Sequence, residues 1–349
     1  MSGHFRVALS GDFLKTDGSP VFPDFDLEPL HRAPGVEVSY LQASDPVRAD
    51  QLADFDALIL LLHRFTPDSI HPNGRLALVA RFGVGYDTVD VEACTRAGIA
   101  LVITPEGVRR PVAVSIITLM LALTGKLMVK DALTREGSPG FARRSEHMGL
   151  GLVGRVLGSV GIGNVGAEMF RLARPFDMRF LAYDPYADAK VAAELGVELV
   201  ELDDVFRRSD VISINCPLTP QTRHLVNAER IALMKRGAYL INTARGPIVD
   251  QQALTAALTE HRIAGAGLDV LAQEPPDADD PILRLDNVIL APHALCWTDQ
   301  LFAGNGAADV KAVLDVQHGR TPYLVVNRAV LDTEIWRRRM ANFRIRSER

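Results

Sequence analysis

Residues 156–166 read VLGSVGIGNVG, an apolar run that leads directly into glycines at positions 161, 163 and 166. This G-x-G-x-x-G spacing, between a strand and a helix, is typical of a dinucleotide-binding turn. Gly161 allows the tight turn, Gly163 lets bare backbone approach a pyrophosphate, and Gly166 lets the next helix pack closely on the strand. That helix, expected over residues 167–174, offers the unpaired N–H groups of its first turn to the phosphates.

An acidic residue lies where such a fold needs one. Asp184 stands 18 residues beyond Gly166, at the end of a second predicted strand over residues 179–183. Its carboxylate can accept hydrogen bonds from both ribose hydroxyls of NAD, and it would repel the extra phosphate of NADP. The order of strand, glycines, helix, strand and acid therefore predicts a Rossmann domain with NAD as the cofactor.

Length and composition predict a soluble protein of two domains. A chain of 349 residues exceeds the size at which a single core stops growing. Hydrophobic residues make up 48% and charged residues 23%, as in ordinary globular proteins. The formal net charge of −5 argues against a nucleic-acid partner. We interpret the arginines between Arg337 and Arg349 as a solvated or frayed tail.

The cysteines and the apolar segments predict a cytoplasmic location. Cys94, Cys216 and Cys296 are odd in number and form no C-x-x-C pair, so we expect a reducing compartment and no disulfide framework. The N-terminus lacks the build of a signal peptide. The apolar segment 112–129 is short for a membrane span and contains polar residues. We expect it to form a helix in a core or a subunit interface, and we expect no membrane partner.

Short apolar strands alternate with helical patterns along the chain, which predicts parallel sheets wrapped by helices. The expected strands are residues 5–9, 36–41, 57–61, 76–81 and 99–103, then 156–160, 179–183, 211–215, 238–242, 265–270 and 288–290. The predicted fold class is α/β, with two doubly wound parallel-sheet domains. We expect the first domain, which binds the substrate, over residues 1–105, completed by 299–349; the NAD-binding Rossmann domain follows over 106–298.

Three segments outside the strands complete this prediction. A long helix from about Pro111 links the domains, and a last helix over residues 299–316 returns the chain to the first domain. Residues 136–140 are expected to form an exposed loop.

Three chemically distinctive side chains follow strands of the nucleotide-binding sheet. Arg245, Glu274 and His293 come after the third-last, second-last and last of these strands, whose carboxyl ends face the ligand crevice. Arg245 can hold a carboxylate and polarise a neighbouring carbonyl oxygen. His293 can give or take the proton that balances hydride transfer. Glu274, by accepting a hydrogen bond from the other imidazole nitrogen, would favour the imidazolium and fix the ring.

At these residues the sequence resembles the D-isomer-specific 2-hydroxyacid dehydrogenase family, from about residue 76 to residue 298. The segment RFGVGYD at 81–87 resembles the substrate loop of the family, residues 160–166 its nucleotide loop, and CPLT at 216–219 its adenine-side loop. The Arg245, Glu274 and His293 segments resemble its catalytic set.

The resemblance implies a role for each of these positions, with no metal required. Arg245 would bind a 2-oxo acid, and His293 would be the general acid/base with Glu274 as its partner. The backbone N–H groups around Gly83 and Val84 would hold the substrate carboxylate, and Asp269 would contact the nicotinamide carboxamide. The residues expected to contact NAD are Gly161, Gly163, Asn164, Val165, Gly166, Asp184, Cys216, Pro217, Thr222, Thr243, Ala244, Arg245, Asp269 and His293. Those expected to contact the substrate are Phe82, Gly83, Val84, Arg245, His293 and Trp297.

The chain departs from the family pattern after the histidine. Leu295-Cys296-Trp297 stands where many members have small residues, so Trp297 either is a core tryptophan or, with Leu295, contacts the side chain of the oxo acid. Val114 replaces a glutamate of the linking helix, and Asn215 replaces a histidine. The retained Glu274 argues against the formate dehydrogenase branch.

We therefore expect an NAD-dependent oxidoreductase that interconverts a 2-oxo acid and a D-2-hydroxy acid, in the reducing direction and as a homodimer. Closure of the two domains would expel water from the substrate. Two alternatives stay open. One is an NAD-sensing binding protein, like the transcriptional corepressors that resemble this family. The other is a phosphite-type dehydrogenase, which keeps the catalytic set but uses no carbonyl.

Overall fold

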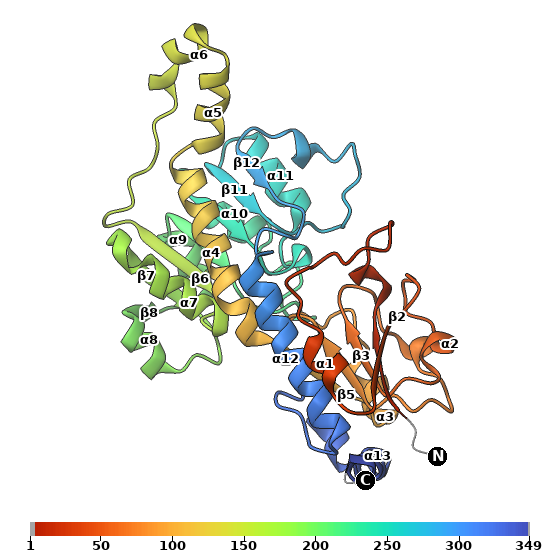
Figure 1. Cartoon of the computed structure of the whole chain (residues 1–349). Coiled ribbons are helices and arrows are strands. Elements are labelled where there is room, and N and C mark those ends of the chain that lie inside the picture. The colour runs from red at the N-terminus through yellow and green to blue at the C-terminus, as the bar shows by residue number, and fades with distance from the viewer. Residues whose placement is uncertain (1–3, 348–349) are drawn as a thin grey trace. The chain divides into compact units, whose positions relative to one another are not determined.

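The computed structural model describes residues 4–347, and the chain separates into two compact units. Unit 1 contains the chain up to Val108 and from Thr298 onward, and unit 2 contains Arg109–Trp297. Each unit holds one parallel sheet with helices on both faces, so the predicted α/β fold class with two doubly wound sheets is confirmed (Figure 1).

Unit 1 is built on a five-stranded sheet of order β2-β1-β3-β4-β5. Its strands are β1 (Phe5–Leu9), β2 (Val36–Tyr40), β3 (Ala57–Leu60), β4 (Leu78–Arg81) and β5 (Ala100–Ile103). The short helices α2 (Ala49–Leu52) and α3 (Val91–Arg96) supply Leu52 and Cys94 to the cluster on one face of this sheet. The helices α1 (Glu28–Arg32), α12 (Asp299–Gln317) and α13 (Glu334–Ser347) complete the unit, and α12 packs on β4 and β5.

The C-terminal arginines, expected in a solvated or frayed tail, lie on the helix α13, which residues 334–347 form. Arg337, Arg338, Arg344 and Arg346 are exposed, so the segment is solvated but not frayed. Trp336, Met340 and Phe343 are buried on one side of the helix, and the Phe343 ring lies 5.1 Å from that of Phe5 on β1. The sequence did not reveal the helix because the arginines between these positions mask an i, i+4, i+7 apolar stripe. Arg349 lies outside the described residues.

Unit 2 is built on a seven-stranded parallel sheet of order β12-β11-β10-β9-β6-β7-β8. Its strands are β6 (Val156–Val160), β7 (Arg179–Tyr183), β8 (Val197–Leu199), β9 (Val211–Ile214), β10 (Tyr239–Asn242), β11 (Gly265–Leu268) and β12 (Val288–Leu290). The short edge strand β8 was not predicted; only its first residue is buried, so it lacks the apolar run of the others.

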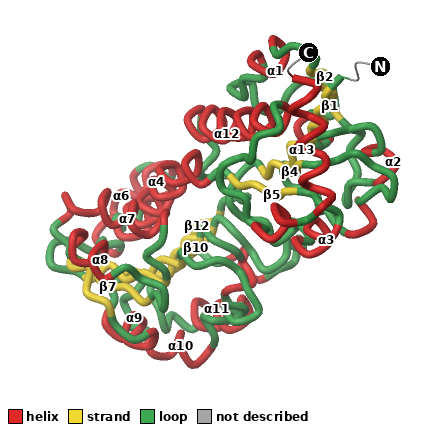
Figure 2. The backbone as a smooth tube through the Cα atoms, turned by 90° about the horizontal axis from the view of Figure 1, so that it is seen from below, coloured by secondary structure: helices red, strands yellow, loops and turns green. Residues whose placement is uncertain are grey.

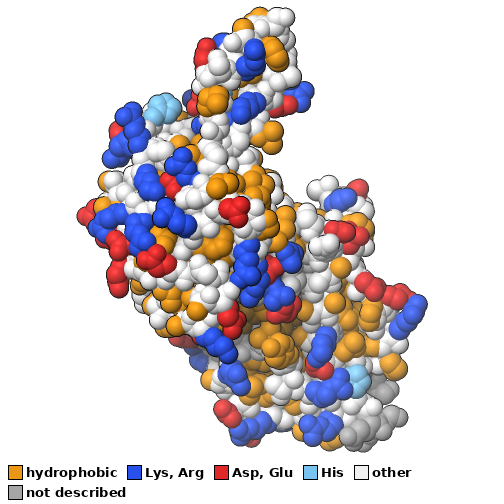
Figure 3. Space-filling view, turned by 90° about the vertical axis from the view of Figure 1, so that its left-hand side faces the viewer, with side chains coloured by type: hydrophobic (Ala, Val, Ile, Leu, Met, Phe, Trp, Pro, Cys, Tyr) orange, Lys and Arg blue, Asp and Glu red, His pale blue; other side chains and the backbone are white. Residues whose placement is uncertain are grey.

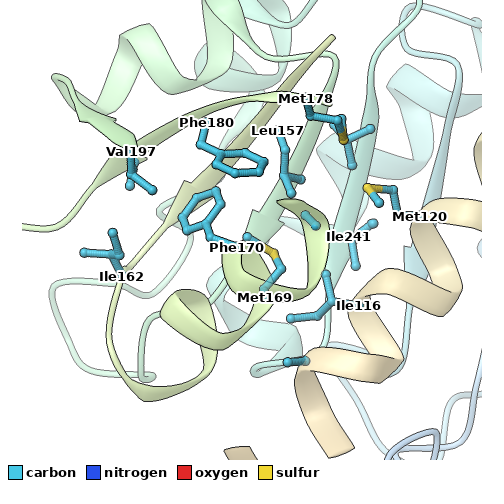
Figure 4. Packing of buried hydrophobic residues seen from close by; sticks show 14 of the residues in the cluster. Ile116, Met120, Leu157, Ile162, Met169, Phe170, Met178, Phe180, Val197 and Ile241 are labelled. Carbon is cyan, nitrogen blue, oxygen red and sulfur yellow. The ribbon is translucent and has the colours of Figure 1, made fainter. Parts of the chain in front are cut away.

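Helices cover both faces of this sheet and enclose two cores (Figure 2). On one face lie α4 (Pro105–Thr124), α7 (Asn164–Ala173) and α8 (Ala189–Leu195); on the other lie α9 (Leu202–Arg208), α10 (Ala228–Leu233) and α11 (Gln251–Thr259). In the first core, Met169 and Phe170 of α7 pack beside Phe180 of β7 and Ile116 and Met120 of α4 (Figure 4). This packing fixes the start of α7 at the end of β6.

The apolar helix α4 is a core element of unit 2. It is the one described helix long and apolar enough to cross a membrane, but half of its most apolar stretch is buried in the protein. Ala113, Ile116, Leu119 and Met120 all belong to the core beside α7. The helix begins at Pro105, earlier than the expected start at Pro111, which is accommodated inside it.

The segment after α4 projects from unit 2 as an arm of two helices, α5 (Leu127–Arg135) and α6 (Ser138–Ala142) (Figure 1). The prediction of an exposed loop over residues 136–140 is wrong for residues 138–140, because α6 begins at Ser138. Gly140 is buried against the backbone of Leu133, and a Cβ there would collide with it. This close approach, which the sequence does not reveal, folds α6 back on α5.

Candidate active site

The register of the unit 2 sheet aligns the ends of its strands. The last residues of six strands pair in one row: Tyr183, Val160, Ile214, Asn242, Leu268 and Leu290. In parallel sheets, ligands bind outside the carboxyl ends of the strands. All the site residues that we expected in unit 2 lie on the segments that leave this row.

The glycine turn after β6 has two positions that exclude a side chain. Gly161 has a φ of +101°, and a Cβ there would lie 2.7 Å from the carbonyl oxygen of Asn215. At Gly166 a Cβ would collide with the carbonyl oxygen of Gly161 and force α7 away from the strand. These two glycines therefore allow the turn and the close approach of the helix.

The surroundings of the turn fit a bound dinucleotide. A Cβ at Gly163 would meet no atom within 4 Å, so the backbone there is open to a ligand. The helix α7 begins at Asn164, three residues earlier than expected, and no side chain caps it. The first turn of a helix is a site at which phosphate oxygens bind. The Thr243 hydroxyl is buried and has no hydrogen-bond partner within residues 4–347.

Two polar side chains that the sequence analysis did not assign to the site hold this turn from behind. Ser159 Oγ donates to the carbonyl oxygen of Gly161 at 2.6 Å, and Asn215 Nδ2 donates to Ser159 Oγ at 2.8 Å. Asn215, noted above only as a departure from the family pattern, therefore ties β9 to the turn. A hydroxyl in the otherwise apolar strand β6 was the available signal.

Asp184 is joined to the same turn. One carboxylate oxygen accepts the N–H of Ile162 at 3.0 Å, and the other accepts the N–H of Tyr186 at 2.9 Å. Each oxygen of an ionised carboxylate can accept more than one hydrogen bond, so the Asp184 carboxylate can still accept hydrogen bonds from ribose hydroxyls. The negative charge thus lies beside the glycine turn, at the end of β7.

The segment after β9 is closed by its own threonines. Thr222 Oγ1 donates to the carbonyl oxygen of Pro217 at 2.7 Å and accepts from the N–H of Thr219 at 2.7 Å. Thr222 therefore shapes this loop internally. Burial raises the pKa of the Cys216 thiol to about 11, so the thiol is uncharged at neutral pH and acts as an apolar wall.

The Arg245 segment is shaped by Asn242, the last residue of β10. Asn242 Oδ1 accepts the N–H of Ala244 at 3.0 Å, and Nδ2 donates to the carbonyl oxygen of Arg245 at 2.9 Å. Gly246 packs so closely on the backbone of Leu271 that a Cβ there would collide. The loops that carry Arg245 and Glu274 are therefore in direct contact.

His293 and Glu274 form the expected pair. His293 Nδ1 lies 2.8 Å from Glu274 Oε2, and Glu274 Oε1 accepts the N–H of Leu271 at 3.0 Å. Burial works to raise the pKa of Glu274, but its hydrogen bond to His293 and the charges of His293 and Arg245 outweigh it and lower the pKa. An ionised Glu274 requires a proton on Nδ1, which leaves Nε2 to exchange a proton with a ligand.

Asp269 fixes the backbone that carries His293. Its Oδ1 accepts the N–H groups of Ala294 and Leu295 at 3.0 and 3.1 Å, and its carbonyl oxygen accepts the N–H of His293 at 2.8 Å. Burial raises the pKa of Asp269, and the two amides oppose that rise. His293 has a φ of +56°, a conformation that non-glycine residues rarely adopt. Three hydrogen bonds therefore hold a strained histidine in place.

Phe82, Gly83 and Val84 follow β4 in unit 1. Phe82 N–H donates to the carbonyl oxygen of Leu60, and the carbonyl oxygen of Gly83 accepts the N–H of Thr104, both at 2.9 Å. The N–H groups of Gly83 and Val84 donate to none of the residues that the structure describes. They are therefore available to an anion. The Phe82 ring is 3% exposed, so this residue can offer a ligand only its backbone.

Trp297 is not a buried core residue, because 40% of it is exposed in the structure. Its N–H donates to the carbonyl oxygen of Ala294 at 3.0 Å, which closes a turn directly after His293. Leu295, by contrast, packs against the core that α4 and α7 share. Of the two residues expected to face the substrate, Trp297 is therefore the more exposed, and Leu295 is half-buried.

Two family models together match most of the chain. The model described as "D-isomer specific 2-hydroxyacid dehydrogenase, catalytic domain" matches residues 19–115, and that described as its "NAD binding domain" matches residues 117–294. The chain belongs to this family. It is an NAD-dependent D-2-hydroxyacid oxidoreductase, and the resemblance seen in the motifs is confirmed.

Individual relatives agree with this assignment. A glyoxylate reductase of Korarchaeum cryptofilum is 38% identical over 290 residues, which are 82% of this chain and 87% of that protein. The structure of D-lactate dehydrogenase from Aquifex aeolicus, complexed with NAD and lactic acid, is 30% identical with a TM-score of 0.76 and covers 88% of this chain and 94% of that one. The D-mandelate dehydrogenase of Rhodotorula graminis is 26% identical with a TM-score of 0.81, covering 93% and 98%.

The open space at Gly163 leads to a prediction. Gly163→Ala should weaken NADH binding about tenfold, because its methyl group would occupy the space through which a pyrophosphate approaches the backbone. The melting temperature should not change, since a Cβ there touches no atom of the protein. Fluorescence titration with NADH measures the effect. Gly237→Ala, at another glycine with open surroundings, is the control; equal NADH affinity in the two variants would contradict the assignment.

Proposed function

We propose that this enzyme reduces a 2-oxo acid to a D-2-hydroxy acid with NADH, and that His293 is the general acid. The observation that carries the proposal is the contact between His293 Nδ1 and Glu274 Oε2 at 2.8 Å, together with the close packing of the Glu274 loop on the loop that carries Arg245. A carbonyl that accepts hydride needs a proton on its oxygen and a cation to polarise it. His293 and Arg245 supply these two functions.

The remaining roles follow from the geometry of each unit. The glycine turn and the first turn of α7 would bind the pyrophosphate of the cofactor, and Asp184 would accept hydrogen bonds from its ribose hydroxyls. In its reduced form, NADH, the bound cofactor would supply the hydride. The N–H groups of Gly83 and Val84 bind the carboxylate of the substrate. Arg245 holds the same acid near its keto oxygen through its planar guanidinium. Ionised Glu274 keeps the imidazole of His293 oriented through the hydrogen bond at Nδ1.

A panel of oxo acids tests this function and separates it from the two alternatives. NADH oxidation should occur with one or more of glyoxylate, hydroxypyruvate, pyruvate and phenylglyoxylate, and His293→Ala should lower kcat by about two to four orders of magnitude with NADH affinity kept. Tight NADH binding without turnover across the panel would instead indicate an NAD-sensing protein. Reduction of NAD with phosphite as the donor would indicate the phosphite-type reaction.

The pH profile tests the partnership of Glu274 with His293. Reduction needs a protonated His293, so kcat should fall on the alkaline side. Glu274→Gln keeps the shape but removes the carboxylate that orients the imidazole, so kcat should fall about tenfold or more along the whole profile, its alkaline limb included. Asp277→Asn, a nearby exposed acid on the same loop, is the control and should leave the limb unchanged. A profile identical to that of the wild type in Glu274→Gln would remove Glu274 from the mechanism.

We propose that Trp297 selects the substrate by the size of its side chain. The exposed ring belongs to the last residue of the turn that follows His293, and it is a surface that can contact this group. Trp297→Ala should change the ranking of kcat/KM between glyoxylate and phenylglyoxylate with little loss of melting temperature, because the residue is not in the core. The control is Tyr186→Ala, which removes an aromatic ring that is more exposed than that of Trp297 and lies elsewhere in unit 2; it should leave the ranking unchanged. An unchanged ranking would exclude this role.

We further propose a cytoplasmic homodimer in which the arm of unit 2 forms the contact between copies. Large apolar side chains are exposed along and beside this arm, namely Leu121, Leu127, Met128, Phe141, Met148 and Val153. Figure 3 shows orange side chains on the projecting helices. Exposed apolar clusters of this kind mark protein interfaces. The net charge of −5 argues against a nucleic-acid partner. The three free cysteines support a location in a reducing compartment.

Sedimentation analysis tests the dimer. The wild type should sediment with twice the mass of the chain, and Met128→Glu/Phe141→Glu should shift it toward the single chain, because two charges would be buried in an apolar contact. Leu199→Glu/Tyr186→Glu places the same charges on exposed apolar residues away from the arm and should leave the mass unchanged. An undisturbed dimer in the arm variant would place the interface elsewhere.

A further inference from the structure

The short turn that follows β1 lies beside the loops that leave β3 and β4. This turn, η1 (Gly11–Phe13), begins two residues after the end of β1. The strand order and register of the unit 1 sheet set the carboxyl ends of β1, β3 and β4 next to one another. A Cβ at Gly11 would collide with the backbone of Ala43, so the turn is also closely packed against the segment after β2.

Two side chains of this segment bind three consecutive N–H groups after β3. Ser10 Oγ accepts the N–H of Leu61 at 3.0 Å. Asp12 Oδ2 accepts the N–H groups of Leu62 and His63 at 2.8 and 3.2 Å. Asp12 Oδ1 accepts the Ser10 hydroxyl at 2.6 Å and lies 3.7 Å from Nδ1 of the His63 ring. The carboxylate of Asp12 therefore ties η1 to the segment 61–63.

The last residue of the same turn packs against the loop after β4. The Phe13 ring meets the buried Phe82 ring edge to face, at 5.3 Å and 84°. Phe25 packs on both, at 5.5 Å from Phe13 and 5.0 Å from Phe82. Phe82 directly precedes Gly83, whose φ of +131° favours glycine, and its carbonyl oxygen accepts from Arg81. The ring contacts thus help to hold the backbone that leads into Gly83.

Loss of the Asp12 carboxylate would release this arrangement. The N–H groups of Leu62 and His63 would lose their acceptor, and an unpaired N–H group that is partly buried costs free energy. The segment 61–63 and η1 would therefore move apart until water satisfied these groups. Phe13 is the next residue after Asp12 and would move with it, which would loosen the packing on Phe82.

We propose that Asp12 is a positioning residue that sets the Gly83 and Val84 N–H groups for the substrate carboxylate. It locks η1 on the segment 61–63, so that Phe13 holds Phe82 in place. The inference rests on the proposed function of the loop after β4 as the carboxylate site. In this role Asp12 acts through protein contacts alone and touches neither substrate nor cofactor.

Steady-state kinetics provide the first test. Asp12→Ala should raise KM about three- to tenfold with kcat changed less than about twofold, because the loop binds the carboxylate equally in the ground and transition states. The factor should be the same for every oxo acid that is reduced, since all share the carboxylate, whereas Trp297→Ala should change their ranking. An unchanged KM in Asp12→Ala would overturn the proposal.

The matched control is Asp17→Ala. Asp17 also accepts an N–H group and a hydroxyl, both of Ser19, but in an exposed turn that follows η1. This variant should leave KM and kcat at the wild-type values. A rise in KM equal to that of Asp12→Ala would show that the effect is not specific to the contact with the segment 61–63, and would overturn the proposal.

A conservative variant separates hydrogen bonding from charge. In Asp12→Asn the amide oxygen can still accept both N–H groups and the NH2 can donate to Ser10 Oγ, so KM should stay within about twofold of the wild-type value. A KM as high as that of Asp12→Ala would show that these hydrogen bonds do not set the loop, and the proposal would fail.

A double-mutant cycle tests whether Asp12 acts through Phe13. Phe13→Leu keeps the hydrogen bonds of the turn but removes the ring that meets Phe82, so it should raise KM as Asp12→Ala does. The double variant should raise KM no further than the larger single effect, and multiplicative effects would contradict the proposed route. If Asp12→Ala does not fold, an unchanged KM in Phe13→Leu overturns the proposal by itself.

Hydrogen exchange separates this inference from the proposed function. Amides in the peptide covering residues 82–88 should exchange faster in Asp12→Ala than in the wild type and in Asp17→Ala, while the peptide over β5 does not change. If the wild type reduces no oxo acid but this difference is found, the positioning of the loop stands and the proposed reaction fails. If exchange over residues 82–88 is the same in all three proteins, the positioning role fails.

Discussion

The row formed by the strand ends of unit 2 is the constraint on which its site depends. Parallel pairing sets Val160, Ile214, Asn242, Leu268 and Leu290 side by side, and neighbouring strands in a sheet lie about 4.8 Å apart. Loops that leave this row therefore start within reach of one another. This is why the segments of Arg245, Glu274 and His293, far apart in the sequence, meet without any local signal that relates them.

The backbone at the site is held from behind by buried polar groups. Ser159 and Asn215 support the carbonyl oxygen of Gly161, Asn242 supports the Arg245 segment, and Arg81 supports Phe82 in unit 1. A backbone turn in contact with a ligand cannot be packed on both sides by apolar groups, because its own carbonyl oxygens need donors. Both units meet this need with a side chain from the end of a strand or the residue just after it.

Strain and charge are concentrated where proton exchange is proposed. The left-handed backbone of His293 costs on the order of 1–3 kcal/mol, and the hydrogen bonds to Asp269 offset this cost. Asp269 is itself desolvated, so its carboxylate is tied to that loop rather than to water. The ring of His293 is thereby directed by its backbone as well as by Glu274.

The sequence by itself determined the elements whose cause is local. The glycine spacing, the apolar strands and Asp184 predict the nucleotide-binding half of the fold because each depends on near neighbours in the chain. Contacts between distant segments were decided only by the tertiary structure. The helix α13 is stable because Trp336 and Phe343 are buried on unit 1, and α6 folds back because Gly140 approaches Leu133. The burial of Asp309 likewise follows from the packing of α12 on β4, because burial depends on which elements meet in space.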